Sequence, residues 1–353
     1  MVTAPRVAVL SLEPWDDVWR RNQHLSVALL RQGLVSQILF VEPPTERRSR
    51  AFQPQQGVSV VRPPLVAAPR YGSLPVAAMW LRRHALQEVD FCWINNAPLG
   101  RWLLDRSTCY DVTDDWRASA HGALTRRRLI RAENVLARRV RTIVCSDVLR
   151  QRWKDRYGVD AAVVPNAVDG GAFASARPRP LSGRAPHFTY VGTLHESRID
   201  VGLVVELALA TQGTVWLVGP DHLEHANRRR LDECQNIIRV GPVQSTSVPG
   251  WMLGSDVLVM PHVISEFTLS LDAIKAYEYL ATDRPIVSTP TSGFQTMAAD
   301  GLQVVARPHF VAAVIRAPET GPVMRPSTAT WDERAVAFAA HAWPAGLSTS
   351  RDV

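Results

Sequence analysis

Apolar and polar positions alternate in blocks along the first half of the chain. Short apolar runs, which predict buried strands of a parallel sheet, lie at residues 6–12, 36–44, 91–96, 107–115 and 142–146. Two segments between them carry apolar residues at helical spacing, residues 18–33 and 123–140. Strands that alternate with helices in this way predict a doubly wound α/β domain.

The second half starts the same pattern afresh. Apolar runs predict strands at residues 187–194, 214–220, 237–241, 257–261 and 285–290, and helical spacing marks residues 199–211 and 272–282. We therefore expect an α/β fold of the GT-B kind, with two Rossmann-like domains facing a cleft. The expected parts are an N-terminal domain (1–168), a linker rich in Pro, Gly and Ser (169–186), and a C-terminal domain (187–353) with a closing helix at residues 330–343.

Composition fits a two-domain globular protein. The chain has 353 residues, 46% of them hydrophobic and 21% charged. Chains of this length usually form more than one hydrophobic core and therefore more than one domain. No apolar run reaches the roughly 18 residues of a membrane span, and the start of the chain resembles a first strand more than a signal peptide. Four scattered cysteines without CxxC spacing indicate a reducing compartment. The expected location is the cytoplasm.

Basic residues are concentrated in the N-terminal half. Residues 1–180 contain 27 Lys and Arg against 16 Asp and Glu, and residues 117–156 contain 12 against 3. Such a patch attracts phosphates or anionic lipid head groups, although a solvated helix face explains it equally well. The stretch lacks interleaved aromatic residues on a recognisable nucleic-acid-binding module, so nucleic acid is not an expected partner.

Several cofactor and metal motifs are missing from the sequence. No GxGxxG follows the first strand, no GxxxxGK[ST] is present, and neither HExxH nor a paired Cys/His cluster occurs. Asp114 and Asp115 are adjacent, which differs from the spaced DxD that holds a metal-bound sugar nucleotide. We expect neither a metal nor a cofactor.

The strongest group of candidate residues lies in the C-terminal half. A predicted strand ends at Pro261, a polar loop follows, and a helix is predicted to begin near residues 270–272. Lys275 and Glu278 are three residues apart and share one helix face. A cation for diphosphate oxygens and a carboxylate for ribose hydroxyls, at the positive end of a helix, suit a nucleoside diphosphate. The alternative is an exposed ion pair, which contributes only tenths of a kcal/mol.

The residues around this pair carry a family resemblance. KAYEYLATDRPIVST, residues 275–289, resembles the donor-binding segment of GT-B glycosyltransferases similar to family four, in the branch related to teichuronic-acid and exopolysaccharide biosynthesis. YDVTDDW, CSDVLRQRW, VVPNAVDGGAF and YVGTLHESRIDVGLVVELA also match, in order, so the resemblance covers nearly the whole chain. The sequence departs from the family at Ser270, where many relatives carry the first acid of a glutamate pair, and at Asp283, where they carry Gly.

The resemblance implies a donor site in the C-terminal half. Glu278 would bind the ribose, and Lys275 and Arg198 would hold the diphosphate. These two cations would also be catalytic, because they stabilise the charge that develops on the leaving diphosphate. The amides of Ser270 and Leu271 would also hold the diphosphate, and Gly192 would let the backbone approach the ligand closely. Backbone groups at Val240 and Gly241 would frame the base.

Candidate acceptor residues lie in the N-terminal half. Asp114 follows a predicted strand, at the edge where open α/β sheets bind ligands, and it is the expected catalytic carboxylate for an acceptor hydroxyl. Its neighbour Asp115 could equally cap the next helix. Arg21, Gln23 and His24 are the other acceptor-side candidates, although a structural role is the stronger interpretation for His24.

Together, the residues and the resemblance predict a glycosyltransferase. It would transfer a sugar from a nucleoside-diphosphate sugar to a hydroxyl of a glycan or lipid-linked acceptor in cell-surface polysaccharide or glycoconjugate biosynthesis. The resemblance implies a retaining, metal-independent hexosyltransferase. The basic N-terminal half suits an anionic surface, with the protein peripheral at the inner membrane face. Two alternatives stay open: a nucleotide-sugar epimerase of the same architecture, and a non-catalytic subunit derived from the fold.

Overall fold

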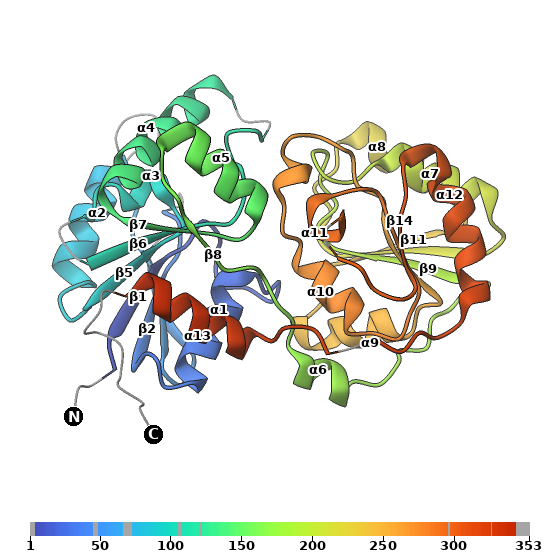
Figure 1. The fold of residues 1–353 in the computed structure, drawn as a ribbon, viewed down its shortest axis with the longest axis horizontal. Helices are drawn as coiled ribbons and strands as arrows, with labels where there is room; N and C mark the ends of the chain where they lie inside the picture. The colour runs from blue at the N-terminus through green and yellow to red at the C-terminus, as the bar shows by residue number, and fades with distance from the viewer. Residues whose placement is uncertain are drawn as a thin grey trace. The chain divides into compact units, whose positions relative to one another are not determined.

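The chain folds into two compact units. A computed structural model describes residues 4–44, 49–65, 73–104, 107–119, 122–295, 297–325 and 327–343. The N-terminal unit comprises the chain up to Pro165 together with the segment from Trp331 onward, and the C-terminal unit runs from Asn166 to Thr330. Each unit is a twisted sheet covered by helices (Figure 1).

The sheet of the N-terminal unit has the strand order β3-β4-β2-β1-β5-β6-β7-β8. Its strands are β1 (Arg6–Leu10), β2 (Gln37–Val41), β3 (Arg50–Gln55), β4 (Val58–Arg62), β5 (Phe91–Ile94), β6 (Ser107–Val112), β7 (Arg141–Val144) and β8 (Ala162–Val163). Neighbouring strands are parallel except for the edge hairpin of β3 and β4. The central strands are apolar at nearly every position because helices cover both faces of the sheet.

The helices of this unit form two layers. On one face, α1 (Arg21–Arg31) and α13 (Trp331–Ala342) lie side by side (Figure 1). The other face shares an apolar core with four helices, which are α2 (Ser73–His84), α3 (Ala97–Gly100), α4 (Ala123–Arg139) and α5 (Asp147–Tyr157).

The closing helix α13 lies elsewhere than the sequence pattern indicated. A helix was expected at residues 330–343 of the C-terminal domain, whereas α13 packs on the N-terminal unit. Its Trp331 ring stacks on His24 with centroids 4.9 Å apart, and its Phe338 ring lies 4.6 Å from that of Trp93. Helical spacing identifies the apolar face of a segment, but it does not identify the surface that receives that face.

The C-terminal unit contains a six-stranded, fully parallel sheet of order β11-β10-β9-β12-β13-β14. Its strands are β9 (His187–Val191), β10 (Thr214–Val218), β11 (Ile237–Gly241), β12 (Val257–Met260), β13 (Ile286–Ser288) and β14 (Leu302–Val304). Its helices are α6 (Gly170–Ser175), α7 (Val201–Ala210), α8 (His225–Asp232), α9 (Val248–Leu253), α10 (Ile274–Leu280), α11 (Ser292–Gln295) and α12 (Arg307–Arg316).

The predicted linker, residues 169–186, is partly helical. Asp169 caps α6, because its Oδ1 accepts a hydrogen bond from the amide of Ala172 at 3.2 Å. This helix contacts α9 and belongs to the C-terminal unit. Within the described ranges, no helix has both the length and the apolar character that a membrane span requires.

Candidate functional site

Both sheets have a point at which the order of their strands reverses. In the C-terminal unit this point lies between β9 and β12, because β10 and β11 extend from one side and β13 and β14 from the other. In the N-terminal unit it lies between β1 and β5. Ligands of open α/β sheets bind outside the carboxyl ends of the strands at such points, so each unit offers one candidate site.

The loops that follow β9 and β12 are joined at the reversal point of the C-terminal unit. The amide of Val263 donates to the carbonyl of Arg198 at 2.8 Å, and the amide of Asp200 donates to Pro261 O at 2.8 Å. The Arg198 guanidinium is half-buried and lies 5.5 Å from the centre of the Phe267 ring. The structure therefore holds Arg198 at the edge of the sheet where the sequence predicted a diphosphate cation.

Gly192 follows β9 directly, and its surroundings leave no room for a side chain. A Cβ atom on Gly192 would lie 2.8 Å from Tyr190 Oη. The backbone of Gly219, with φ of 144°, also approaches closely, since a Cβ on it would lie 2.1 Å from the carbonyl oxygen of Gly192. Packing inside the unit therefore explains why both positions are glycine.

His262 is a buried residue of this edge that the sequence analysis did not identify. Its Nε2 lies 3.3 Å from Tyr190 Oη, which donates to the carbonyl of Thr193 at 3.2 Å. Burial, with a smaller effect of Arg198, lowers the pKa of His262 to about 3, so the ring is neutral. The feature of the sequence that could have identified His262 is its position directly after Pro261, where the predicted strand ends.

Helix α10 carries the predicted cation and carboxylate. Nζ of Lys275 bonds Oε2 of Glu278, and only 8% of Glu278 is exposed. The neighbouring Tyr279 ties this helix to the sheet edge, because its hydroxyl accepts from the amide of Val191 at 2.9 Å, one residue before Gly192. The pair is thus held near the carboxyl end of β9, and Glu278 is largely withdrawn from solvent.

Helix α10 begins later than predicted. A 3₁₀ turn occupies Thr268–Ser270, and the α-helix starts at Ile274. The amides of Ser270 and Leu271 are bonded to Phe267 O and Thr268 O, at 3.0 and 3.4 Å. These two amides are therefore used inside the turn, and the expectation that they hold a diphosphate does not fit the structure as it stands.

Asp272 connects the start of this segment to the chain that enters the unit. Its carboxylate accepts from the Asn166 amide and, at 2.9 Å, from the hydroxyl of Tyr277. The side chain of Asn166 donates to the carbonyl of Asp272 in return. No sequence pattern predicts this contact, because the two residues are 106 positions apart.

The predicted base-binding residues lie at the end of β11. Val240 and Gly241 are half-buried, and the amide of Gly219 donates to Gly241 O at 2.9 Å. Gly241 has φ of 83°, and a Cβ on it would face open space. Both residues therefore lie on the same edge as Gly192, separated from it by the end of β10.

Asp283 replaces the glycine of many relatives without strain. No residue other than glycine has a positive φ in the described parts of the chain. Asp283 is exposed, forms an ion pair with Arg284 at 3.0 Å, and accepts from the amide of Val323 through its carbonyl. The position therefore does not require the conformation that favours glycine.

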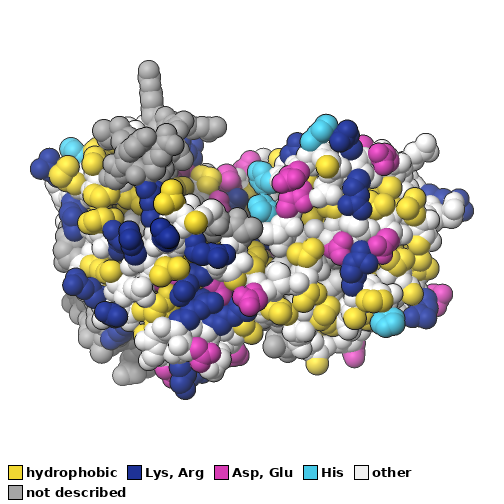
Figure 2. Space-filling view, turned by 90° about the horizontal axis from the view of Figure 1, so that it is seen from above, with side chains coloured by type: hydrophobic (Ala, Val, Ile, Leu, Met, Phe, Trp, Pro, Cys, Tyr) yellow, Lys and Arg dark blue, Asp and Glu magenta, His cyan; other side chains and the backbone are white. Residues whose placement is uncertain are grey.

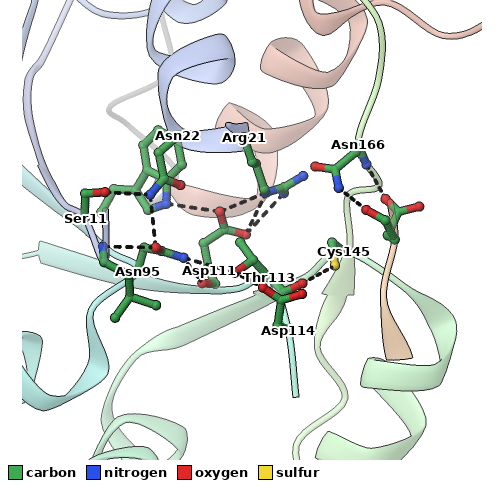
Figure 3. A network of polar contacts seen from close by, with 12 residues as sticks. Ser11, Arg21, Asn22, Asn95, Asp111, Thr113, Asp114, Cys145 and Asn166 are labelled. Atoms are coloured by element: carbon green, nitrogen blue, oxygen red, sulfur yellow. Dashed lines mark hydrogen bonds and ion pairs between the residues drawn. The ribbon is translucent and has the colours of Figure 1, made fainter. Parts of the chain in front are cut away.

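A buried polar network lies at the reversal point of the N-terminal unit (Figure 3). The Arg21 guanidinium bonds both carboxylate oxygens of Asp111 at 3.0–3.3 Å, and only 4% of the Arg21 side chain and none of Asp111 are exposed. Asn95 donates to the carbonyl of Asp111 at 3.2 Å and accepts from Asn22 at 3.0 Å. Arg21 was predicted on the acceptor side, and the structure gives it this carboxylate partner, which spacing alone does not reveal.

The two adjacent carboxylates after β6 have different surroundings. Asp114 is half-buried, and Thr113 Oγ1 donates to it at 3.4 Å. Asp115 is buried and accepts from Arg152 and Arg156 of α5 at 2.6–2.8 Å. Although burial alone would raise its pKa, the two arginines lower the pKa of Asp115 overall. Asp115 thus anchors α5, which leaves Asp114 as the more accessible of the two.

Gln23 and His24 have structural roles in the first helix. Gln23 is buried, and its side chain accepts from the Arg20 amide at 2.9 Å and donates to Asp16 O at 3.2 Å, which closes the start of α1. His24 packs against Trp19 and Trp331, with centroids 5.2 and 4.9 Å away. Neither side chain is presented as an acceptor ligand, and for His24 this agrees with the structural interpretation.

No cluster of three or more His, Cys, Asp or Glu side chains suited to a metal ion occurs among the described residues. The four cysteines are buried as free thiols.

The C-terminal unit matches a known family. Residues 185–319 match the family described as Glycosyl transferases group 1. Over 197 residues the chain is 27% identical to a protein of Bacillus subtilis (strain 168) named for teichuronic acid biosynthesis, the glycosyltransferase TuaH. That match covers 51% of this chain and 49% of the relative, so the chain spans about half the length of this curated relative.

Solved structures share the fold along nearly the whole chain. Sucrose-phosphate synthase from Thermosynechococcus elongatus has a TM-score of 0.72 at 17% identity and covers 96% of both chains. WaaG, a glycosyltransferase involved in lipopolysaccharide biosynthesis, has a TM-score of 0.67 at 13% identity over 95% of both chains. HepE from Anabaena, in complex with UDP and glucose, has a TM-score of 0.64 at 14% identity over 96% of this chain and 95% of that one.

The fold is therefore that of the GT-B glycosyltransferases. Residues 185–319 match the Glycosyl transferases group 1 family, and the resemblance to family-four-like GT-B glycosyltransferases is confirmed.

Proposed function

We propose that this chain transfers a sugar from a nucleoside-diphosphate sugar to a hydroxyl of a glycan or lipid-linked acceptor in cell-surface polysaccharide biosynthesis. The observation that carries the proposal is the placement of Arg198, Lys275 and Glu278 at the carboxyl edge of the second sheet, around its reversal point. The family match covers residues 185–319 of this unit, and HepE, which shares the fold, binds UDP.

Two cations and one carboxylate suit the polar groups of a nucleoside diphosphate. Arg198 and Lys275 are matched to phosphate oxygens, whereas the buried carboxylate of Glu278 is an acceptor for ribose hydroxyls. Because Lys275 bonds Glu278 in the structure, a bound diphosphate would compete with this carboxylate for Nζ. The long, flexible side chain of lysine allows that exchange.

The same residues supply the electrostatic part of catalysis. Negative charge develops on the diphosphate as it leaves, and Arg198 and Lys275 stabilise that charge. In this proposal the protein cations take the place of a metal ion, and the anomeric configuration is retained. Asp114, half-buried beyond β6, orients the acceptor hydroxyl and takes up its proton.

The N-terminal unit carries the acceptor side in this proposal. Its concentration of arginines favours an acceptor attached to an anionic membrane surface, and we place the protein in the cytoplasm, peripheral at the inner membrane face. Nucleic acid is not a proposed partner.

Calorimetric titration with UDP and with GDP tests the donor site. Glu278→Gln keeps the shape of the side chain and one acceptor oxygen but removes the charge, and a hydrogen bond to a charged group contributes about 1 kcal/mol more than one between neutral groups. The Kd of the preferred nucleotide should therefore rise roughly fivefold. Asp283→Asn, a matched charge removal at an exposed position, should leave the Kd unchanged. Equal affinities for wild type and Glu278→Gln contradict the assignment.

Product analysis separates sugar transfer from the two alternatives. Incubation with a UDP-sugar and lipid-linked or glycan acceptors should give a new glycosidic bond and free UDP. An epimerised sugar nucleotide formed without acceptor identifies an epimerase instead. Tight nucleotide binding without turnover on any acceptor identifies a non-catalytic subunit.

A further inference from the structure

His262 is a buried titratable residue at the carboxyl edge of the second sheet, and the proposed mechanism gives it no part. It lies two residues after β12, and only 6% of it is exposed. Other histidines of the C-terminal unit, such as His195, His222 and His309, are exposed, and Figure 2 shows histidine side chains on the surface of this unit. Burial of a polar ring costs free energy unless the ring is hydrogen-bonded. The contacts of His262 therefore indicate its role.

The ring of His262 donates a hydrogen bond to Tyr190, near the end of β9. The hydroxyl proton of Tyr190 goes to the carbonyl of Thr193 at 3.2 Å, so Tyr190 Oη accepts from His262 Nε2 at 3.3 Å. Because the His262 ring is neutral, Nε2 carries its single N–H proton. His262 thus orients the hydroxyl that holds the start of the loop after β9.

The backbone of His262 contacts the other end of the same loop. Ile199, which follows Arg198, forms an antiparallel bridge with His262. The His262 amide donates to Thr289 Oγ1 at 3.1 Å, and this hydroxyl donates to the His262 carbonyl at 2.8 Å. Thr289 follows β13 directly. One residue therefore connects the ends of β9, β12 and β13, and it restrains both ends of the loop that carries Arg198.

Arg198 lies close to this group of side chains. Burial raises the pKa of Tyr190 to about 12, and the charge of Arg198 opposes that shift. Burial lowers the pKa of His262 to about 3, and the charge of Arg198 adds to that shift. The guanidinium is thus near both rings, and it lies 5.5 Å from the centre of the Phe267 ring. A guanidinium that is ordered before its ligand arrives loses less conformational freedom on binding and therefore binds more tightly.

We propose that His262 is a positioning residue of the donor site, where it holds the loop after β9 and thereby directs Arg198 toward the diphosphate. The inference rests on the proposed function and deepens it, because it assigns the geometry of one donor cation to a residue that does not touch the ligand. An apolar side chain would fill the same space, but only a donor at the position of Nε2 orients the Tyr190 hydroxyl.

Calorimetric titration with UDP or GDP, whichever wild type binds more tightly, tests the proposal. His262→Leu removes the N–H donor and should weaken binding roughly three- to tenfold, which corresponds to the cost of ordering one long side chain on binding. Tyr190→Phe removes only the hydroxyl and should give a similar loss. The amide of His262→Gln can donate to Tyr190, so this variant should bind within about twofold of wild type.

Dependence on Arg198 separates positioning from a general effect on stability. In the Arg198→Gln background, His262→Leu should cause no further loss, because no guanidinium is left to direct. Thr189→Val is the matched control, since it removes a buried hydroxyl one residue before Tyr190. That hydroxyl accepts from Ser255 at 2.6 Å and lies outside the loop, so the affinity of Thr189→Val should equal that of wild type.

Wild-type affinity in both His262→Leu and Tyr190→Phe overturns the proposal. A loss that His262→Gln shares, or that persists in the Arg198→Gln background, overturns it as well, and so does an equal loss in Thr189→Val. If His262→Leu does not fold, Tyr190→Phe in the two backgrounds gives the same test. Wild-type protein that binds neither nucleotide contradicts the proposed function itself, whereas tight binding that is insensitive to His262 and Tyr190 contradicts only the positioning role.

Discussion

The buried ion pair of Arg21 and Asp111 gives the sharpest stability prediction for the N-terminal unit. Its hydrogen bonds are 3.0–3.3 Å long, and Trp93 Nε1 adds another to Asp111 at 3.2 Å. Arg21→Met removes the cation and leaves a carboxylate that is fully buried. The loss of one partner of a buried pair costs about 3–5 kcal/mol, because the other charge is left without compensation.

For a unit of this size, about 1 kcal/mol shifts the melting temperature by roughly 2–4 °C. Arg21→Met should therefore lower the transition of the N-terminal unit by roughly 6–20 °C in scanning calorimetry. Addition of UDP shows which calorimetric transition belongs to which unit, because UDP should stabilise the C-terminal unit only. Arg31→Met is the control on the same helix, because its ion pair with Asp332 is half exposed and should contribute less than about 1 kcal/mol.

A double variant tests the cause of the loss. Arg21→Met with Asp111→Leu replaces the pair by apolar side chains and should recover most of the stability, apart from the partner that Trp93 loses. A shift of less than about 2 °C for Arg21→Met, or a double variant no more stable than the single one, would show that an uncompensated Asp111 charge does not destabilise the unit.

Three further predictions concern other positions. Gly219→Ala should destabilise the C-terminal unit by several kcal/mol in denaturant unfolding. The new Cβ would lie 2.1 Å from the Gly192 carbonyl oxygen, and the φ of this position is 144°. A loss of stability below about 1 kcal/mol would contradict this packing. Burial raises the pKa of Glu133 to about 7, so the stability that this group contributes at acid pH is lost as the pH rises from its unfolded pKa through 7. Between pH 5 and 8, the free energy of unfolding of wild type should fall, and that of Glu133→Gln should fall by roughly 2–3 kcal/mol less. Parallel pH profiles of the two proteins would contradict the raised pKa of Glu133. Asp283→Gly should lower the melting temperature slightly, since no positive φ favours glycine there; stabilisation would show that the position is strained.

The strands and their order of succession were predictable because buried parallel strands are apolar on both faces. The segments around β1, β5, β9 and β12 are examples, because nearly every residue of these four strands is buried. The edge hairpin of β3 and β4 was missed because β3 is exposed at nearly every position and so carries no apolar run. The docking of α13 was missed because its receiving surface lies about 300 residues away in the sequence, as the pair Arg31–Asp332 shows.

The candidate site was predictable only where its contacts are local. Lys275 and Glu278 are three residues apart, so helical geometry alone indicated their pairing. The contacts of Arg21 with Asp111 and of Asn166 with Asp272 join residues 90 and 106 positions apart, which no spacing rule predicts. The start of α10 was placed too early because a 3₁₀ turn continues the same polar pattern.

If the second sheet binds a nucleoside diphosphate at its reversal point, a crystal structure of the chain with UDP will show the nucleotide there. We expect diphosphate oxygens within hydrogen-bonding distance of Arg198 and Lys275, with ribose hydroxyls on the Glu278 carboxylate. UDP bound away from the carboxyl ends of β9 and β12, with Lys275 and Glu278 still bonded to each other, would contradict it.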